Sequence, residues 1–328
     1  DKFYKENMYY FKVDDEDYAV KPMNCPGHIL IFKSKIRSYR DLPIRFFELG
    51  TVYRQEKAGV LHGLLRVRGF TQDDAHIFCR PDQIQKEVVE VIDFVFEVMK
   101  DFGFNDLGIE LSTKPAKYIG KDEDWAAATS ALEESLKEKK LQYQINEGDG
   151  AFYGPKIDIK LKDALGRQWQ CATIQCDFNL PDRFDLGYID ENNASCRPIM
   201  LHRAILGSVE RFFGTLIEHY AGAFPAWLAP VQVMIIPIKP EHQSYAQSVK
   251  ESLQKQDVRV IIDERNESLN KRIREGTLKK IPYLLIIGDK EIAGKTVAVR
   301  KRVVGDQGSI PVEQFVAEIK EEIITKKP

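Results

Sequence analysis

Apolar residues recur at helical spacing in the first two-thirds of the chain. Residues 83–102 carry one every three or four positions, and Gly103 follows as a stop signal. A second helix is predicted over residues 124–141, where acidic residues come first and lysines last, as the helix dipole favours. A third run with helical character covers residues 203–220. The pattern therefore predicts three helices in this part of the chain.

Between the helices, apolar and charged residues alternate with a period of two. Residues 154–162 place Ile157, Ile159 and Leu161 on one side, and residues 169–178 alternate similarly, which indicates half-buried strands. Residues 53–74 have the composition of a strand, a loop and a returning strand. Strands joined by hairpins and by long helical connections, without regular strand–helix alternation, predict an antiparallel sheet flanked by helices over residues 1–228.

The pattern changes after Pro225 to Pro230, which we interpret as a linker. The next run, residues 231–238, is continuously apolar, as in a strand that is buried on both faces. Further strands are predicted at 258–262, 283–287 and 296–300, and helices at 244–255, 269–280 and 312–324. We therefore expect a smaller α/β domain over residues 229–328, with helices on both faces of its sheet.

Composition narrows the classes of protein to consider. The chain has 328 residues, of which 43% are hydrophobic and 30% charged, enough for two globular domains. A net charge of -2 means that a polyanion must be met by a local basic patch. Five cysteines without a C-x-x-C pair predict a reducing, cytoplasmic location. No apolar run reaches membrane-spanning length, so no membrane partner is expected.

Three residues that are far apart offer metal-binding chemistry. Cys25, His76 and His202 supply one thiolate and two imidazoles, which suits a zinc site with an open coordination position. On spacing alone, a buried cysteine and two hydrogen-bonded histidines are the more common explanation. The surrounding sequence, which resembles a nucleotide site, favours the metal instead.

Arginines and an aromatic residue suit ATP binding. The guanidinium groups of Arg54 and Arg66 can fork onto phosphate oxygens, and the ring of Phe70 can cover a base. Glu56 offers a carboxylate that could accept from an exocyclic amine. A charged, solvated hairpin is the alternative interpretation. Downstream, a glycine at 207 precedes Arg211, a further arginine that could face phosphate.

These pieces resemble class II aminoacyl-tRNA synthetases. Tyr53-Arg-x-Glu56 with Arg66-x-x-x-Phe70 is similar to their second signature motif, and residues 207–211 are similar to the third. Residues 21–28, 69–78, 150–156 and 202–208 closely resemble the threonyl-tRNA synthetase family, over essentially the whole chain. The resemblance implies a catalytic domain at 1–228 and an anticodon-binding domain at 229–328. It also implies ATP-dependent activation of L-threonine and transfer to tRNA(Thr).

The resemblance implies roles for matching residues. Cys25, His76 and His202 match the ligands of one zinc ion per chain. Met23, Gln72, Asp74 and Tyr153 match the amino-acid pocket. Arg54 matches the arginine that holds the ATP α-phosphate and the amino-acid carboxylate, Arg211 belongs to the third motif, and Lys156 matches a residue near the reacting carboxylate. The rest of the ATP-binding set matches Glu56, Arg66, Phe70, Gln170, Thr173, Gln175 and Ser208, and ATP is expected to bind together with Mg²⁺. The anticodon contacts match Asn266, Arg274, Lys280, Glu291 and Arg300.

A zinc ligand set is physically suited to selecting threonine. Threonine and valine are nearly isosteric, and an apolar pocket separates such pairs by only about a hundredfold. A metal that binds the amine and the β-hydroxyl together leaves valine one ligand short. Serine carries both groups, so we expect serine to be activated as well.

Some features depart from the family or leave alternatives. The family's first motif and a histidine used in aminoacyl transfer would lie before Asp1, although a homodimer is expected for the parent protein. Lys280, Gln55 and Cys176 stand where other residues are usual. One alternative is a prolyl enzyme of the same subclass, but the Cys–His–His set argues against it. A second alternative is a related binding protein that has lost catalysis, but the retained arginines argue against that. A zinc hydrolase would need an H-E-x-x-H run or a clear general base.

Overall fold

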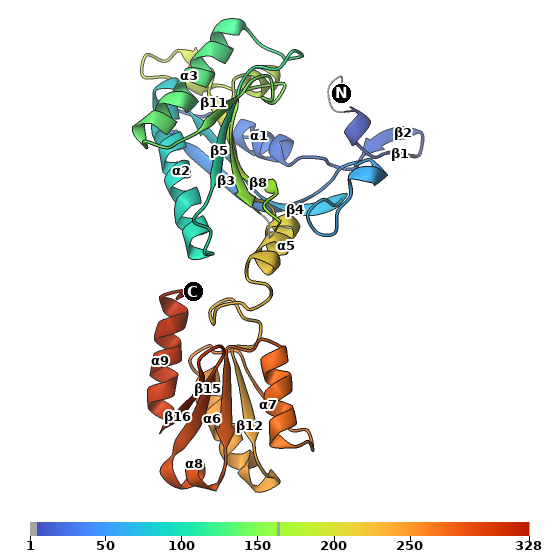
Figure 1. Ribbon diagram of the computed structural model, residues 1–328. Coiled ribbons are helices and arrows are strands. Elements are labelled where there is room, and N and C mark those ends of the chain that lie inside the picture. The colour runs from blue at the N-terminus through green and yellow to red at the C-terminus, as the bar shows by residue number, and fades with distance from the viewer. Residues whose placement is uncertain (1–4, 163–164, 328) are drawn as a thin grey trace. The chain divides into compact units, whose positions relative to one another are not determined.

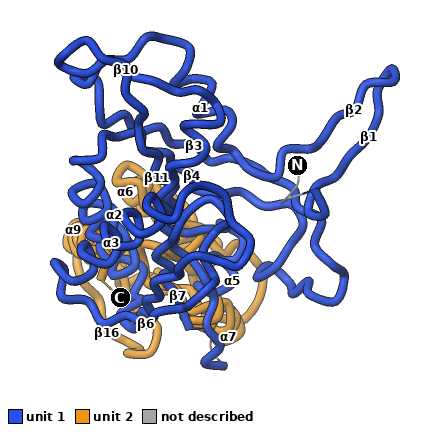
Figure 2. Tube along the Cα trace, turned by 90° about the horizontal axis from the view of Figure 1, so that it is seen from above, with its two compact units in different colours: residues 1–216 blue, residues 217–328 orange. Residues whose placement is uncertain are grey.

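The computed structural model describes residues 5–162 and 165–327. The chain forms two compact units, residues 1–216 and 217–328, which are coloured separately in Figure 2. The boundary falls inside helix α5 (Val209–His219). Each unit is described by itself.

A mixed sheet forms the centre of the first unit. In its described part, seven strands lie in the order β3-β4-β11-β8-β7-β5-β6, and only the β5–β6 pair is parallel. This confirms the predicted antiparallel sheet. The strands in that order are β3 (Ile44–Tyr53), β4 (Gly69–Cys79), β11 (Ile199–Ser208), β8 (Gln168–Asp177), β7 (Lys156–Lys162), β5 (Gly108–Ser112) and β6 (Gln144–Asn146).

Two long helices lie side by side over this sheet (Figure 1). Helices α2 (Ile84–Asp101) and α3 (Asp122–Glu138) contact β8, and α2 also contacts β11. The buried residues of α2 include Val88, Val91, Ile92, Val95 and Met99, which is the apolar stripe that the sequence predicts. Both predicted helices are confirmed to within a few residues at each end.

The prediction of one helix over residues 203–220 is wrong in its first part. Residues up to Ser208 belong to β11, and the helix α5 begins only at Val209. Strand β11 pairs with β4 on one side and β8 on the other. Hydrogen bonds to two neighbouring strands outweigh the helix propensity of Arg203, Ala204 and Leu206, since propensity is a weak prior.

Several short elements of the first unit were not predicted. Strands β1 (Tyr10–Val13) and β2 (Glu16–Ala19) form a hairpin that projects from the unit in Figure 1. Helix α1 (Cys25–Lys33) has an almost uniformly apolar sequence with a proline in its first turn. The others are α4 (Asn179–Arg183), β9 (Tyr188–Ile189), β10 (Ser195–Cys196), and the 3₁₀ turns η1 (Lys5–Asn7), η2 (Tyr39–Asp41), η3 (Ala58–Val60) and η4 (Pro81–Gln83).

The second unit is a smaller α/β domain, as predicted. In its described part, five strands lie in the order β13-β12-β14-β15-β16, parallel on either side of β12 and antiparallel beyond β14. The strands are β12 (Val233–Pro237), β13 (Val260–Ile262), β14 (Tyr283–Ile287), β15 (Thr296–Lys301) and β16 (Gly305–Pro311). The helices are η5 (Pro240–His242), α6 (Gln243–Gln254), α7 (Leu269–Leu278), α8 (Asp289–Gly294) and α9 (Val312–Ile324).

The central position of β12, buried on both faces, explains its continuous apolar sequence. Val233 and Ile235 pack into one core with residues of α6 and α9. Met234 and Ile236 pack into a second core, to which Leu269 and Ile273 bring α7. Helices therefore cover both faces of this sheet, as the sequence predicts. In neither described range is any helix long and apolar enough to cross a membrane.

Candidate active site

The register of the large sheet brings four predicted residues into one cross-strand row. His76 on β4 lies opposite His202 on β11, and His202 lies opposite Gln175 on β8. Gln175 in turn lies opposite Lys156 on β7. Residues directly opposite each other in a sheet point to the same face. Four separated segments therefore contribute to one surface.

A second row lies beside the first and adds a residue that was not predicted. Asp74, Ala204, Thr173 and Asp158 lie opposite one another on β4, β11, β8 and β7. Asp158 is 1% exposed, although the alternation of β7 predicts that its charged residues face solvent. The prediction that the charged side of this strand faces solvent is therefore wrong at Asp158, because that side of β7 is covered by the residues of the site.

A cavity of about 720 Å³ lies on this face. It is lined by almost every residue predicted for the catalytic domain. These are Met23, Cys25, Arg54, Glu56, Arg66, Phe70, Gln72, Asp74, His76, Tyr153, Gln170, Thr173, Gln175, His202, Ser208 and Arg211. Lys156 is the exception, since its ammonium group is engaged by Asp158 and Asp149 at 2.8 and 3.1 Å.

The three candidate metal ligands meet in the lining of the cavity. One ligand atom from each of Cys25, His76 and His202 lies within 4.8 Å of the others, and all three residues are buried. Cys25 occupies the first turn of α1, and the two histidines come from adjacent strands. One thiolate and two imidazoles fit zinc with an open position.

Burial tunes the protonation of these ligands. Desolvation, reinforced by the neighbouring His202 and His28, lowers the pKa of His76 well below its usual value, which favours the neutral imidazole that binds metals. Burial, together with the charges of Asp74 and Asp177, raises the pKa of the Cys25 thiol. A bound divalent cation would stabilise the thiolate in this environment.

The candidate amino-acid pocket lies beside the metal ligands. The ring of Tyr153 is 5.2 Å from that of His202, and its hydroxyl donates to Oε1 of Gln175. Asp74 accepts a hydrogen bond of 3.1 Å from Nδ2 of Asn24, whose Oδ1 accepts one of 2.8 Å from Lys21. Burial raises the pKa of Asp74. Asn24 and Lys21 were not predicted individually, although both lie in the 21–28 segment.

Two arginines of the cavity lining, Arg54 and Arg211, are held by contacts within the protein. Nε of Arg54 donates to the carbonyl of Pro22 at 3.0 Å, and its guanidinium lies 5.1 Å from the centre of the Phe70 ring. Arg211 donates to the carbonyls of Leu65 and Gln170 at 2.8 and 2.9 Å. These contacts hold both side chains in place before any ligand binds. Burial lowers the pKa of Arg211.

Arg66 is held in a different way. Its Nε and Nη2 both donate to Oε2 of Glu56, at 3.2 and 3.0 Å. Arg66, which is predicted to contact phosphate, is therefore paired with Glu56, which is predicted to contact the base, across the hairpin between β3 and β4. The loop and the returning strand predicted within residues 53–74 are confirmed, while the first strand, β3, already ends at Tyr53.

Asp73 shapes the end of β11, where the segment that the sequence predicts to bind nucleotide begins. Its carboxylate accepts the amide hydrogens of Ile205, Leu206 and Gly207 at 2.7, 3.0 and 2.9 Å. The register of β11 shifts here, and Gly207 has φ of 74°. A Cβ at Gly207 would lie 2.5 Å from the carbonyl oxygen of Cys171. Only glycine fits this turn without strain, and the turn places Arg211 in the first turns of α5.

Asp158 links the candidate ATP residues from below. Its Oδ1 accepts from Nε2 of Gln170 at 2.6 Å and from Oγ1 of Thr173 at 3.0 Å. Its Oδ2 lies 2.8 Å from Nζ of Lys156. Burial opposes protonation of Lys156, but the charges of Asp158 and Asp149 outweigh it and raise the pKa of the ammonium group. One carboxylate therefore fixes three predicted site residues.

The predicted anticodon residues are spread over the second unit. Asn266 and Glu291 follow the carboxyl ends of the parallel strands β13 and β14. Arg274 is exposed on α7, and Arg300 lies opposite Leu284, on the face of the sheet that α7 covers. Lys280 precedes β14, at the other end, where its ammonium donates to the carbonyl of Ala221. The structure thus separates Lys280 from Asn266 and Glu291.

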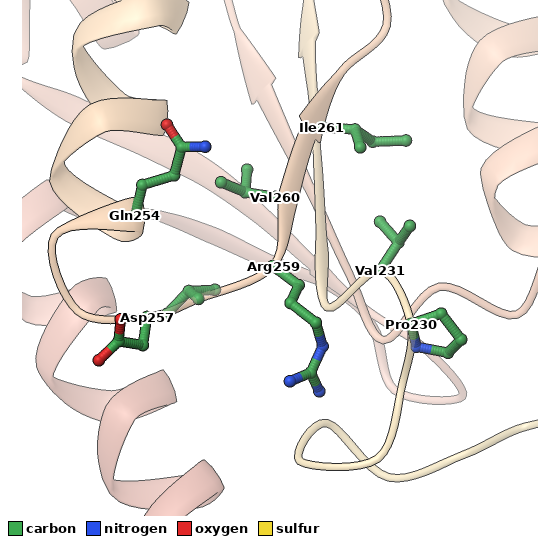
Figure 3. Close-up of a pocket in the computed structure, with 8 residues that line it drawn as sticks. Pro230, Val231, Gln254, Asp257, Arg259, Val260 and Ile261 are labelled. Carbon is green, nitrogen blue, oxygen red and sulfur yellow. The ribbon is translucent and has the colours of Figure 1, made fainter.

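A hollow of about 410 Å³ lies in the second unit, between the end of α6 and β13 (Figure 3). Val260 and Ile261 line it beside the guanidinium of Arg259, which donates to the carbonyls of Ala229 and Trp227. The lining contains none of the predicted site residues. Its main charged group is already bonded, so the larger cavity of the first unit is the stronger candidate site.

Two family models match the chain. Residues 9–220 match the tRNA synthetase class II core domain (G, H, P, S and T), and residues 232–322 match an anticodon binding domain. The chain is 57% identical to threonine–tRNA ligase of Carboxydothermus hydrogenoformans, over 99% of this chain and 51% of that protein. The chain thus spans about half the length of the curated relatives it matches.

Solved structures agree with this similarity. A crystal structure described as the RNA binding domain of threonyl-tRNA synthetase from Cryptosporidium parvum Iowa II has a TM-score of 0.92 at 44% identity, covering 97% of this chain and 80% of that one. A putative threonyl-tRNA synthetase from Aeropyrum pernix has a TM-score of 0.83 at 32% identity, covering 99% and 79%.

Proposed function

Since the chain belongs to the class II tRNA synthetases, and within them to the threonyl-tRNA synthetase family, we propose that it activates L-threonine with ATP and transfers it to tRNA(Thr). One observation carries the proposal. A single cavity is lined both by the buried Cys25, His76 and His202 and by the arginines at 54 and 211. Side chains suited to selecting a small polar amino acid therefore lie in the same cavity as side chains suited to binding phosphates.

We propose that Cys25, His76 and His202 hold one zinc ion. Bound there, zinc supplies open coordination positions for the amine and the β-hydroxyl of threonine. Met23, Gln72, Asp74 and Tyr153 would enclose the rest of the amino acid. Asp74 suits the amine because the hydrogen bond from Asn24 fixes its carboxylate. Valine lacks the hydroxyl, and a site built to bind that group rejects the analogue strongly.

Activation would place the threonine carboxylate in line with the α-phosphorus of ATP. The carboxylate oxygen attacks phosphorus, pyrophosphate leaves and threonyl-adenylate forms. Positioning and charge neutralisation dominate such a step. Arg54 and Arg211 suit it because backbone carbonyls already orient their guanidinium groups. Mg²⁺ bound with ATP would supply further neutralisation of the phosphates.

The other ATP contacts would come from around the same cavity. Phe70 offers a ring face for the adenine, while Glu56, Arg66, Gln170, Thr173, Gln175 and Ser208 offer polar groups along the nucleotide. Lys156 would act from the edge of the site, beside Gln175 in the cross-strand row. A ribose hydroxyl of tRNA then attacks the threonyl carbonyl and AMP leaves.

The anticodon would be read by residues 229–328, the smaller domain. Asn266, Arg274, Lys280, Glu291 and Arg300 provide donors and acceptors of the kind that bind splayed bases. Most of these lie at the surface, where a single-stranded loop could reach them. The catalytic domain would be residues 1–228.

We also propose that the protein acts as a cytoplasmic homodimer. Phe47 and Leu49 on the edge strand β3 are 57% and 63% exposed and point to the same side of the sheet. Exposed apolar residues on an edge strand are typical of a surface that another chain covers.

Amino-acid-dependent ATP–pyrophosphate exchange tests the proposal. Threonine, serine, valine and proline are compared side by side with zinc-loaded protein. The proposal expects strong exchange with threonine, weaker exchange with serine and almost none with valine or proline. Strong exchange with proline would indicate a different synthetase of this subclass. Binding of ATP without exchange for any amino acid would indicate a binding protein.

A further inference from the structure

One candidate metal ligand, His76, is held from behind by a second buried histidine. Nδ1 of His76 lies 2.7 Å from Nδ1 of His28, and the two ring planes are at 75°. On its other side, Nε2 of His28 lies 3.5 Å from Oε1 of Glu48. A carboxylate only accepts, so this contact favours the tautomer of His28 with hydrogen on Nε2 and an accepting Nδ1. With that tautomer, Nδ1 of His76 is the donor.

The other histidine, His202, is held at the opposite ring nitrogen. Its Nε2 lies 2.9 Å from Oδ2 of Asp177, which is 0% exposed. The second oxygen of Asp177 accepts the amide hydrogens of Asn179 and Leu180, at 2.8 and 3.0 Å. These amides belong to the start of α4, so the carboxylate is fixed by the backbone and in turn fixes the imidazole.

We propose that His28 and Asp177 are positioning residues that orient the two histidines of the metal site. They leave Nε2 of His76 and Nδ1 of His202 as the ligating atoms. This inference rests on the proposed zinc site. A histidine uses the nitrogen that is not hydrogen-bonded to its outer partner, and that partner sets both the tautomer and the ring orientation.

The geometry on the cavity side agrees with this assignment. Nε2 of His76, the atom left unengaged by His28, lies 3.6 Å from Oδ1 of Asp74, which lines the cavity. The rings of His76 and His202 are nearly perpendicular, at 85°, with centroids 4.7 Å apart. The two imidazoles come from opposite positions on adjacent strands and are held at different nitrogens. Their free nitrogens can therefore be directed at one metal ion.

Four variants of the whole chain separate orientation from general stability. His28→Leu removes the acceptor, whereas His28→Asn can keep an amide oxygen near the position of Nδ1. Asp177→Asn retains an oxygen that can cap α4 but removes the charge beside His202. Glu87→Gln is the matched control, because Glu87 is a buried carboxylate of the same unit that pairs with Arg45 instead.

Zinc affinity is measured by competition with a chromophoric chelator, and the absorption spectrum of the Co²⁺-substituted protein reports the ligand field. We expect His28→Leu and Asp177→Asn to lose about 10- to 100-fold in zinc affinity and to shift the cobalt bands. His28→Asn should recover most of the affinity, and Glu87→Gln should keep both readouts. Thermal unfolding identifies any variant that has lost its fold.

The outcomes distinguish the two levels of the proposal. If the wild-type chain binds no zinc, the proposed metal site itself is wrong. If the wild-type chain binds zinc while folded His28→Leu and Asp177→Asn keep its affinity and its cobalt spectrum, only the positioning role is wrong. Should His28→Leu unfold, the comparison of Asp177→Asn with Glu87→Gln still tests the positioning role, which is wrong if both variants keep the wild-type zinc affinity and cobalt spectrum.

Discussion

His76 and His202 lie directly opposite each other on the neighbouring strands β4 and β11, with their ring planes at 85°. Both side chains point to the cavity face of the sheet, where Cys25 approaches from the first turn of α1. Register between strands, and not proximity in the chain, therefore creates the candidate metal centre.

Cys25→Ala is expected to abolish stoichiometric zinc binding and threonine-dependent exchange together. A site that keeps only two imidazoles loses the thiolate, its one anionic ligand. Zinc content by atomic absorption and ATP–pyrophosphate exchange measure the two effects. Cys196→Ala is the control, since Cys196 belongs to β10, outside the cavity lining. Full zinc content and activity in Cys25→Ala would refute the ligand assignment.

Gly207→Ala is expected to raise the KM for ATP and to lower stability by about 1–3 kcal/mol, because a side chain is strained at φ of 74°. The new methyl group would meet the carbonyl of Cys171 and displace the start of α5, which carries Arg211. Steady-state kinetics and urea unfolding measure the two effects. Gly59→Ala is the stability control, since its Cβ would meet nothing within 4 Å. An unchanged KM for ATP would contradict the predicted displacement.

Asp158→Asn is expected to lower kcat/KM for ATP by about 10- to 100-fold while zinc content stays unchanged. Charged hydrogen bonds of this kind contribute about 1.5–3 kcal/mol, and each 1.36 kcal/mol is about tenfold in rate. The carboxylate holds Lys156, Gln170 and Thr173, so its loss should affect nucleotide binding and not the metal end. Asp106→Asn, an exposed ion-pair partner of Lys162, should behave as wild type. Equal losses in both variants would point to charge and not to position.

Arg300→Ala is expected to lower kcat/KM for aminoacylation of tRNA by about tenfold or more, since a base contact contributes about 1–3 kcal/mol. Pyrophosphate exchange without tRNA should be unchanged. Lys320→Ala on α9 is the control, because α9 packs into the core on the other face of the sheet. A defect in exchange as well as in charging would argue against an anticodon role.

Stability at acid pH is expected to depend on Asp263. Hydrogen bonds from Arg265 lower the pKa of this carboxyl below its usual value. A depressed folded-state pKa stabilises the protein above the unfolded-state pKa of about 3.9, and the contribution is lost as pH falls through the folded-state value. Unfolding by urea between pH 7 and pH 3 should therefore show Asp263→Asn less stable at neutral pH, with the difference shrinking toward pH 3. A difference that is constant with pH would exclude this linkage.

The sequence by itself determined the elements whose periodicity is strong. The apolar stripe of α2 shows that one side of this helix is buried, and the continuous apolar run of β12 shows that both sides of this strand are buried. The resemblance to the synthetase family also predicted most of the cavity lining, because motifs such as those of Arg54, Phe70 and Arg211 are compact segments with fixed spacing. These signals are local, so one chain without its fold is enough to find them.

Only the tertiary structure decided which distant residues meet. Residues 203–208 form a strand because β4 and β8 flank them, and Asp158 is buried because its strand lies beneath the site. His28 and Asp177 became visible only once α1 and β8 were placed against the two histidines. Periodicity shows which side of an element is buried, but strand register and hydrogen-bond partners depend on pairing between segments far apart in the chain.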